Sequence, residues 1–271
     1  EGQPIVVKDG AQRNPNMCMD GNGGVFIIWK DFTVGQYEHV YATHINSNNE
    51  IIAAGTGIPI ITNNSHHSGI SLETAGNGEA AMVWVDDRSE TLDIYGQRIA
   101  ADHTNGSITT LWSTEEEGGA VICDASGDQN YAKITYAKDC CDDEGVTVVT
   151  WQDDRNGNFD IYMQYLLADG TSYFEDYQQG LPLTSLPSSS TKPRVKADES
   201  GAYIAWFDDR NNNSDIYAQK VLFSQINPIV WIEEGLDICT NNESQTGVRL
   251  SVDGQGGVYF VWQDDRNGGD E

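Results

Sequence analysis

The chain has 271 residues and a net charge of −27 at pH 7, from 42 Asp and Glu against 15 Lys and Arg. Nucleic acids and anionic membrane surfaces are bound mainly through Lys and Arg, so this charge argues against both as partners. No apolar run approaches the length that crosses a bilayer, and the sequence shows neither a signal peptide nor a sorting tail. It begins at Glu1 rather than Met, which suggests that a leader has been removed.

One motif recurs along the chain, starting each time at a Trp. It reads WVDDRSETLDIYGQ at 84–97, WQDDRNGNFDIYMQ at 151–164 and WFDDRNNNSDIYAQ at 206–219. A degenerate copy, WKDFTVGQYEHVYATH, starts at Trp29, and the chain ends within another, WQDDRNGGDE, at 262–271. Successive Trp positions are 55, 67, 55 and 56 residues apart. A motif that occurs once per repeat is more typical of architecture than of a single active site.

Each repeat predicts four β-strands. The first is a short segment such as GISLETA, AKITYAK, PRVKADE or VRLSVD, and the second is the apolar run that ends at the Trp, such as GVTVVTW. The third is DIYGQRI, DIYMQYL or DIYAQKV, and the fourth follows a Gly in GIPIIT, GAVICD, GLPLTS and GLDICT. Side chains alternate along a strand, so Asp160, Tyr162 and Gln164 are expected on one face of the third strand.

Four strands per repeat, with no helical periodicity anywhere, predict an all-β fold, a β-propeller of four-stranded blades. The N-terminal GQPIVVKDGAQRNP aligns with a fourth strand, and the chain stops after the second strand of its last repeat. We therefore expect one domain over residues 1–271 with five blades, the last shared between the termini, so that residues 2–8 pair with residues 248–262. A third strand of that blade is then expected beyond residue 271, in a longer multidomain chain, and six or more blades are the alternative if the missing part is longer. The repeats are expected at 14–64, 65–128, 129–190, 191–244, and 245–271 together with 1–13.

The polar part of the motif is interpreted as a structural network. An Arg fork can bind a carboxylate through two hydrogen bonds and also bond loop carbonyls, which would hold the loop in one geometry. Reuse of one residue set in every repeat is what such a network predicts, since buried polar groups must be paired. Each Arg is therefore expected to be largely buried. The network residues are Trp84, Asp86, Arg88, Asp93, Tyr95, Gln97, Trp151, Asp153, Arg155, Asp160, Tyr162, Gln164, Trp206, Asp208, Arg210, Asp215, Tyr217 and Gln219.

Calcium is the alternative interpretation of the same loops, although no cofactor is otherwise expected. Two copies have the Asp-x-Asn-x-Asn-x-Asp spacing of oxygen-ligand loops. Against calcium, an Arg lies inside each loop, the Glu of the longer calcium motif is absent, and DDRSETLD breaks the series. The positions concerned are Asp154, Asn156, Asn158 and Asp160 in one copy, and Asp209, Asn211, Asn213 and Asp215 in the other.

A ligand face is expected where the loops after the second strands and the loops between blades come together. Besides the DDR loops, this face would collect TNNSHHS, DASGDQN and TNNESQT. No nucleophile motif is present and no blade stands out as catalytic, so no catalytic residue is assigned. A His pair in a polar loop is also often merely solvated. The candidate ligand-face residues are His66, His67, Asp128, Asn130 and Asn242.

Five cysteines give no clear disulfide framework. Cys123 and Cys239 occupy equivalent fourth-strand positions and are expected to be small core residues. A bridge from Cys123 to Cys140 or Cys141 is the alternative. No Cys-x-x-Cys pair occurs, so no zinc or other metal site is assigned.

The consensus W-x-D-D-R-x-G-x-x-D-I-Y-x-Q resembles the repeat of secreted bacterial β-propeller proteins, over nearly the whole chain. The copy at Trp29 departs from it by lacking the Asp-Arg pair. The resemblance implies export or cell-surface location and binding rather than catalysis. We expect a non-catalytic extracellular binding or scaffold module whose ligand is a carbohydrate or a protein. The alternative is a carbohydrate-active, glycosidase-like enzyme with its active site at the mouth of the channel, for which a pair of carboxylates would be needed.

Overall fold

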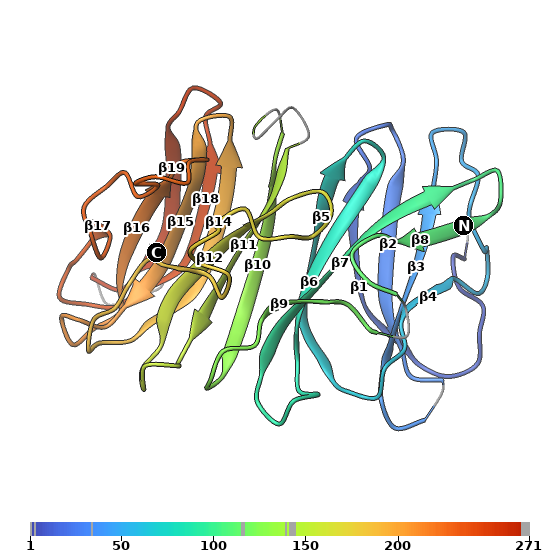
Figure 1. Cartoon of the computed structure of the whole chain (residues 1–271), viewed down its shortest axis with the longest axis horizontal. Helices are drawn as coiled ribbons and strands as arrows, with labels where there is room; N and C mark the ends of the chain where they lie inside the picture. The colour runs from blue at the N-terminus through green and yellow to red at the C-terminus, as the bar shows by residue number, and fades with distance from the viewer. Residues whose placement is uncertain are drawn as a thin grey trace.

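The computed structural model describes residues 2, 4–33, 35–114, 117–138, 140 and 145–266, and every regular element in them is a β-strand (Figure 1). The strands form five antiparallel sheets in chain order, called blades 1 to 5 below. The predicted all-β architecture of four-stranded blades is confirmed. Within this described part of the chain, no helix is long and apolar enough to cross a membrane.

Each sheet is a meander of consecutive strands. Blade 1 holds β1 (Gln12–Met19), β2 (Val25–Asp31), β3 (His39–Ile45) and β4 (Ile58–Ile61). Blade 2 holds β5 (His67–Gly76), β6 (Glu79–Asp86), β7 (Asp93–Asp102), β8 (Ser107–Thr110) and β9 (Ala120–Cys123). Blade 3 holds β10 (Gln129–Ala137), β11 (Val146–Asp153), β12 (Asp160–Leu166) and β13 (Leu181–Pro182). Blade 4 holds β14 (Ser190–Asp198), β15 (Gly201–Asp208), β16 (Asp215–Val221) and β17 (Leu236–Cys239), and blade 5 holds β18 (Gln245–Val252) and β19 (Val258–Asp264).

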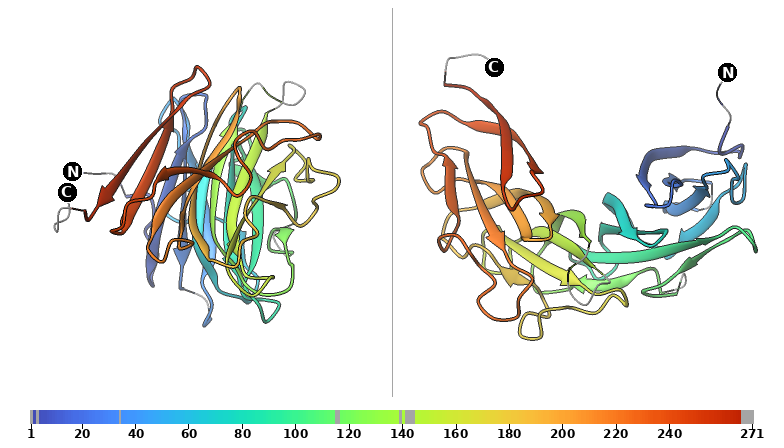
Figure 2. Two further views of the ribbon diagram at one scale, coloured as in Figure 1. Left: turned by 90° about the vertical axis from the view of Figure 1, so that its left-hand side faces the viewer. Right: turned by 90° about the horizontal axis from the view of Figure 1, so that it is seen from above.

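The blades stand side by side along an arc whose two ends remain apart, with the N- and C-termini at opposite tips (Figure 2). The first strand of each blade contacts the first strand of the next, from β1 through β5, β10 and β14 to β18. These five strands form the concave side of the arc, and we call them the inner wall. The third and fourth strands lie toward the convex side.

Hydrophobic clusters fill the spaces between neighbouring sheets. Every residue of β11 and of β12 is buried, because both faces of these middle strands are covered by other blades. One cluster joins Tyr165 and Met163 of blade 3 to Ile204 and Trp206 of blade 4, and corresponding clusters join the other neighbouring pairs. Each large side chain buried in this way contributes about 1.5–3 kcal/mol.

A Gly before each fourth strand packs on the Trp of the same blade. Gly180 has a φ of 97°, and a Cβ built there would lie 2.5 Å from the Trp151 ring. Gly57, Gly119 and Gly235 stand in the same relation to Trp29, Trp84 and Trp206. A side chain has no room at this position, and the backbone conformation itself favours Gly.

Two expectations about the sheets require correction. Blade 2 has five strands instead of four, because a long β7 pairs with β8 at its far end and with β9 at its start. The expected pairing of residues 2–8 with residues 248–262 is wrong. Val6 instead forms an isolated parallel bridge with Gly55 beside blade 1, and β18 and β19 form a two-stranded sheet.

The N-terminal segment has a physical reason to stay at blade 1. Lys8 pairs with Asp31 at 3.1 Å, and its ammonium lies 4.1 Å from the centre of the Tyr41 ring. Asp31 and Tyr41 occupy the positions that Asp153 and Tyr162 hold in blade 3. Lys8 thus supplies the cation that the degenerate motif of blade 1 lacks.

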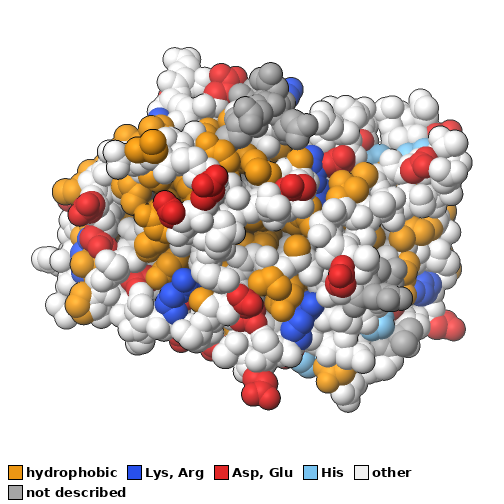
Figure 3. All heavy atoms as spheres, viewed as in Figure 1, with side chains coloured by type: hydrophobic (Ala, Val, Ile, Leu, Met, Phe, Trp, Pro, Cys, Tyr) orange, Lys and Arg blue, Asp and Glu red, His pale blue; other side chains and the backbone are white. Residues whose placement is uncertain are grey.

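The convex face consists mostly of uncharged polar side chains and backbone, with hydrophobic side chains and carboxylates scattered among them and Lys and Arg at a few places (Figure 3). A cleft of about 690 Å³ on this side is lined by Tyr177, Ile226, Trp231 and neighbouring residues.

Candidate ligand-binding site

The repeated motif forms one polar network per blade, centred on a buried Asp. In blade 3, Asp153 accepts hydrogen bonds from Trp151 Nε1 at 3.0 Å, from the Arg155 main-chain N at 3.0 Å and from Arg155 Nε at 2.8 Å. Arg155 Nη2 completes the two-pronged contact, and the Asp153 side chain is fully buried. Asp86 and Asp208 repeat this arrangement with Arg88 and Arg210.

The Arg of each network ties the loop to the rest of its blade. Arg155 Nη2 donates to the Gln179 carbonyl at 2.9 Å, and its guanidinium lies 4.0 Å from the centre of the Tyr162 ring. Arg88 and Arg210 have the same two kinds of contact, and only about a fifth of each Arg side chain is exposed (21%, 17% and 20% in chain order). Stacking on an aromatic face stabilises an Arg by about 0.5–2 kcal/mol. Each Arg therefore holds its loop against the carbonyl and the aromatic ring of its own blade.

The remaining motif positions also bond within the blade. Gln164 Nε2 donates to the Tyr177 carbonyl at 2.7 Å, and Gln97 and Gln219 reach Ser113 and Ile232 in the same way. Burial raises the pKa of Asp160, against the opposing hydrogen bonds from Asn156 and Thr184. Burial alone would also raise the pKa of Asp86, but hydrogen bonds from Arg88 and Trp84 outweigh it and lower that pKa.

The loop positions with calcium-like spacing bond to one another or to the main chain. Asn156 Nδ2 donates to Asp160 Oδ2 at 3.1 Å, and Asn158 Nδ2 donates to the Leu186 and Ser188 carbonyls. Asp154 Oδ1 accepts from the Asp128 main-chain N at 2.6 Å, which fixes the segment that enters β10. In the described residues, no group of three or more His, Cys, Asp or Glu is placed to hold a metal ion.

The two histidines proposed for the ligand face have different environments. His66 is more than half exposed, and its Nδ1 lies 3.0 Å from Glu38 Oε2. His67 is fully buried against Trp84, so it does not face a ligand, and burial lowers its pKa. Burial opposes ionisation of Glu38, but hydrogen bonds from Lys30 and His66 outweigh it and lower the Glu38 pKa to about 2. A carboxyl group with so low a pKa is poorly suited to act as a general acid.

The other ligand-face candidates are partly engaged. Asp128 Oδ1 accepts from the Leu92 main-chain N at 3.0 Å, which joins blades 2 and 3. Asn130 is half-buried on β10, and its Oδ1 has no hydrogen-bond partner among the described residues. Asn242 is exposed in the loop before β18. Cys123 is a buried free thiol in contact with Arg155, so the bridge to Cys140 is not formed, and Cys141 lies outside the described residues.

A feature of the inner wall was missed by the sequence reasoning. Every first strand has a β-bulge two or three residues after its start, and the residue in the bulge has a positive φ. These residues are Asn14, Gly69, Tyr131, Lys192 and Gly247, with φ of 53°, 62°, 56°, 54° and 67°. Gly at this position in two repeats was the available signal, because Gly is the usual residue where φ is positive.

Tyr131 and Lys192 hold this conformation although it is unfavourable for them. A left-handed conformation costs a residue with a side chain about 1–2 kcal/mol, and such strain is often found at binding sites. Tyr131 is 45% exposed on the inner wall. Next to the bulges lie Lys133 and Arg194 at equivalent positions of β10 and β14. Strands β10 and β14 are in contact, and burial together with the charge of Arg194 lowers the pKa of Lys133.

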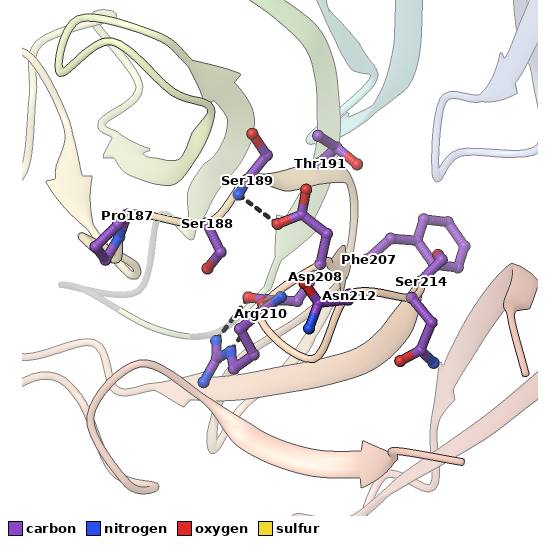
Figure 4. Close-up of a pocket in the computed structure, with 11 residues that line it drawn as sticks. Pro187, Ser188, Ser189, Thr191, Phe207, Asp208, Arg210, Asn212 and Ser214 are labelled. Atoms are coloured by element: carbon purple, nitrogen blue, oxygen red, sulfur yellow. Dashed lines mark hydrogen bonds and ion pairs between the residues drawn. The ribbon is translucent and has the colours of Figure 1, made fainter. Parts of the chain in front are cut away.

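Two adjacent pockets, which share three lining residues, open beside this region. The larger, of about 680 Å³, lies between the loop at Ser188–Ser189 and the DDR loop of blade 4 (Figure 4). Its lining is rich in hydroxyl and amide side chains, including Thr191, Asn212 and Ser214. The smaller, of about 240 Å³, shares Thr191, Phe207 and Ser214 with the first and extends onto the inner wall between blades 4 and 5. Together they form a polar path from the loops to the concave side.

No protein-family model matches the chain, and no curated protein matches its sequence. Among solved structures, it is similar to an endo-arabinase from Bacteroides thetaiotaomicron, at 12% identity and a TM-score of 0.45, over 100% of this chain and 95% of the other. It is also similar to the α-L-arabinofuranosidase of Fusarium graminearum with arabinobiose, at 8% identity and a TM-score of 0.47, over 88% and 73%. A neuraminidase-like protein of A/little yellow-shouldered bat/Guatemala matches at 12% identity and a TM-score of 0.44, over 81% of this chain. This chain spans only 60% of that protein.

Proposed function

We propose that the chain is a carbohydrate-binding module that acts outside the cell and takes its ligand on the inner wall, beside the DDR loops of blades 3 to 5. The observation that carries this proposal is the exposed Tyr131 in a strained bulge on the concave side. An aromatic face can pack on the apolar face of a sugar ring. The adjoining hydroxyl and amide groups can exchange hydrogen bonds with its hydroxyls.

Binding rather than hydrolysis is supported by the kind of side chains at this place. Glycosidases need two carboxyl groups on either side of the scissile bond. The described residues that line the smaller pocket include Lys192, Arg194 and Arg249 but no Asp or Glu. In the larger pocket, Asp208 is bound by Arg210, and Asp209 accepts a hydrogen bond from the Ser189 main-chain N at 2.6 Å.

The test is a glycan-array screen of the purified chain, followed by titration of the best ligands and analysis of the same glycans for cleavage. We expect binding without cleavage, and loss of binding in Tyr131→Gly. The unfolding midpoint of this variant should not fall, since Gly relieves the strain of the bulge. Tyr177→Ala, which changes an exposed tyrosine on the other side of the molecule, is the matched control and should bind normally.

Three results would count against the proposal. Cleavage of a bound glycan would favour the enzyme alternative, and no binding to any glycan would remove the carbohydrate assignment. Equal binding by Tyr131→Gly and the unchanged chain would move the site away from the inner wall. Recovery of the native protein from inside the producing cells would contradict the proposed location.

A further inference from the structure

The inner wall is basic in a strongly acidic protein. Its five strands carry six Lys and Arg but only two acidic residues, whereas the whole chain has 15 basic and 42 acidic residues. One acidic residue has an opposite charge beside it, and the other is bonded by a serine. Glu73 pairs with Lys196 at 3.7 Å, and Asp198 accepts hydrogen bonds from Ser200. A concave surface of one sign focuses the electric field and raises the local concentration of opposite charge.

Three of these cations occupy the same position, directly after the bulge, on three neighbouring strands. They are Lys133 on β10, Arg194 on β14 and Arg249 on β18. Each donates only to nearby main-chain carbonyls, and no carboxylate of the described residues pairs with any of them. Burial, followed by the charge of Arg249, lowers the pKa of Arg194. The fold thus places these three cations at equivalent positions of adjoining strands, β10 beside β14 and β14 beside β18, without a carboxylate partner, which costs stability.

We propose that the inner wall binds an acidic polysaccharide, whose carboxylate or sulfate groups are held by Lys133, Arg194 and Arg249 while a sugar ring packs on Tyr131. This assignment rests on the proposed carbohydrate-binding function and specifies its ligand class. The Arg fork fits the planar oxygens of a carboxylate and those of a sulfate alike. A third pocket, of about 400 Å³, is lined by Lys133 together with residues of blades 1 and 2, and its other cation, Lys30, is paired with Glu38 at 2.8 Å.

The rim of the arc favours a polysaccharide over the other polyanions. Asp87 and Asp209 are exposed in the DDR loops next to the bulges. A nucleic acid carries a phosphate at every unit and would be repelled there. A polysaccharide presents hydroxyl groups between its charges, and carboxylates can accept hydrogen bonds from hydroxyls.

The experiment compares three polysaccharides with the intact chain: polygalacturonate, its carboxyl-reduced neutral form, and a sulfated galactan. Affinity is measured by titration calorimetry at low and at high salt. We expect at least one acidic form to bind about tenfold more tightly than the neutral form, with the difference shrinking as salt screens the charges. Poly-glutamate and duplex DNA are included as polyanions of other classes.

Variants that each remove one positive charge test whether Arg194 and Arg249 cause the preference for acidic polysaccharides. Arg194→Gln and Arg249→Gln should each lower affinity for the acidic form about tenfold and lower affinity for the neutral form by a smaller factor. Lys138→Gln removes one exposed charge just past the end of β10 and is the matched control, expected to bind normally. The unfolding midpoint of Arg194→Gln should stay the same or rise, because a repulsion is relieved. A purely structural role would lower it.

The outcomes distinguish the proposal of an acidic ligand from the proposal of carbohydrate binding on which it rests. Equal affinity for acidic and neutral forms would overturn the acidic assignment and leave the carbohydrate proposal standing. Binding of no polysaccharide would overturn both. Binding of poly-glutamate or DNA as tightly as the acidic polysaccharide, with the same dependence on Arg194 and Arg249, would place the ligand in a different class.

Discussion

The contact between Gly180 and Trp151 allows a stability prediction with an internal control. In Gly180→Ala, the new Cβ must take a φ of 97° and would lie 2.5 Å from the ring. Gly157 in the same blade has a φ of 93°, but a Cβ there would meet no atom within 4 Å. The two variants therefore share the backbone cost and differ only in the clash.

The expected losses of stability follow from the backbone cost and the steric clash. The left-handed backbone costs about 1–2 kcal/mol in either variant, and forcing a methyl group into a packed interior adds about 1–3 kcal/mol. Gly157→Ala should thus lose about 1 kcal/mol, and Gly180→Ala about 3 kcal/mol. In a chain of this size, each kcal/mol lowers the thermal midpoint by about 2–4 °C.

The assay is urea unfolding at pH 7, followed by tryptophan fluorescence and far-ultraviolet circular dichroism. If both probes agree, the free energies of the two variants can be compared directly. Combining Gly180→Ala with Trp151→Phe should cost less than the sum of the single changes, since the smaller ring leaves room for the methyl group. Equal destabilisation by Gly180→Ala and Gly157→Ala would refute the role assigned to the ring.

Other expectations concern the polar networks. Arg210→Ala removes the partner of the buried Asp208, the hydrogen bond to the Glu234 carbonyl and the stacking on Tyr217. Unfolding experiments should therefore show that the free energy of unfolding falls by about 2–4 kcal/mol. A fall below about 1 kcal/mol would mean that the pair behaves as a surface ion pair. Because the folded-state pKa of Asp208 is lowered, its stabilising contribution is complete above the unfolded pKa and is lost as the pH falls below about 4. Acid titration of stability should therefore be steeper for the unchanged chain than for Arg210→Ala. Burial raises the pKa of the Cys123 thiol to about 12, so iodoacetamide at pH 8 should modify Cys123 only after unfolding, as mass spectrometry of the peptides would show.

The repeat made the blades predictable from the sequence, whereas their closure and their inner surface were not. The buried second strands and the network around Asp153 follow from local patterns, since alternation and fixed offsets decide them. The position of the N-terminal segment could not be predicted in this way. It depends on whether the segment pairs in blade 5 or is held at blade 1 by the contacts of Lys8, and no local sequence pattern decides between the two. The bulge at Tyr131 depends on how two strands pair. A tyrosine in the sequence does not indicate a positive φ, whereas a Gly does.

The contacts within each DDR network affect how the number of repeats in such a chain can change during evolution. The contacts of Arg155 with Asp153, the Gln179 carbonyl and the Tyr162 ring lie within a single repeat, and only its contact with Cys123 Sγ, at 3.2 Å, reaches the preceding blade. A recombination event that inserts or deletes one repeat therefore leaves the Asp–Arg pair of every remaining DDR network intact, and the adjoining sheets meet surfaces of the same kind as before. The number of repeats can then change without disrupting the networks. The bulge residues on the concave side, one per repeat, can be substituted independently to suit a new ligand.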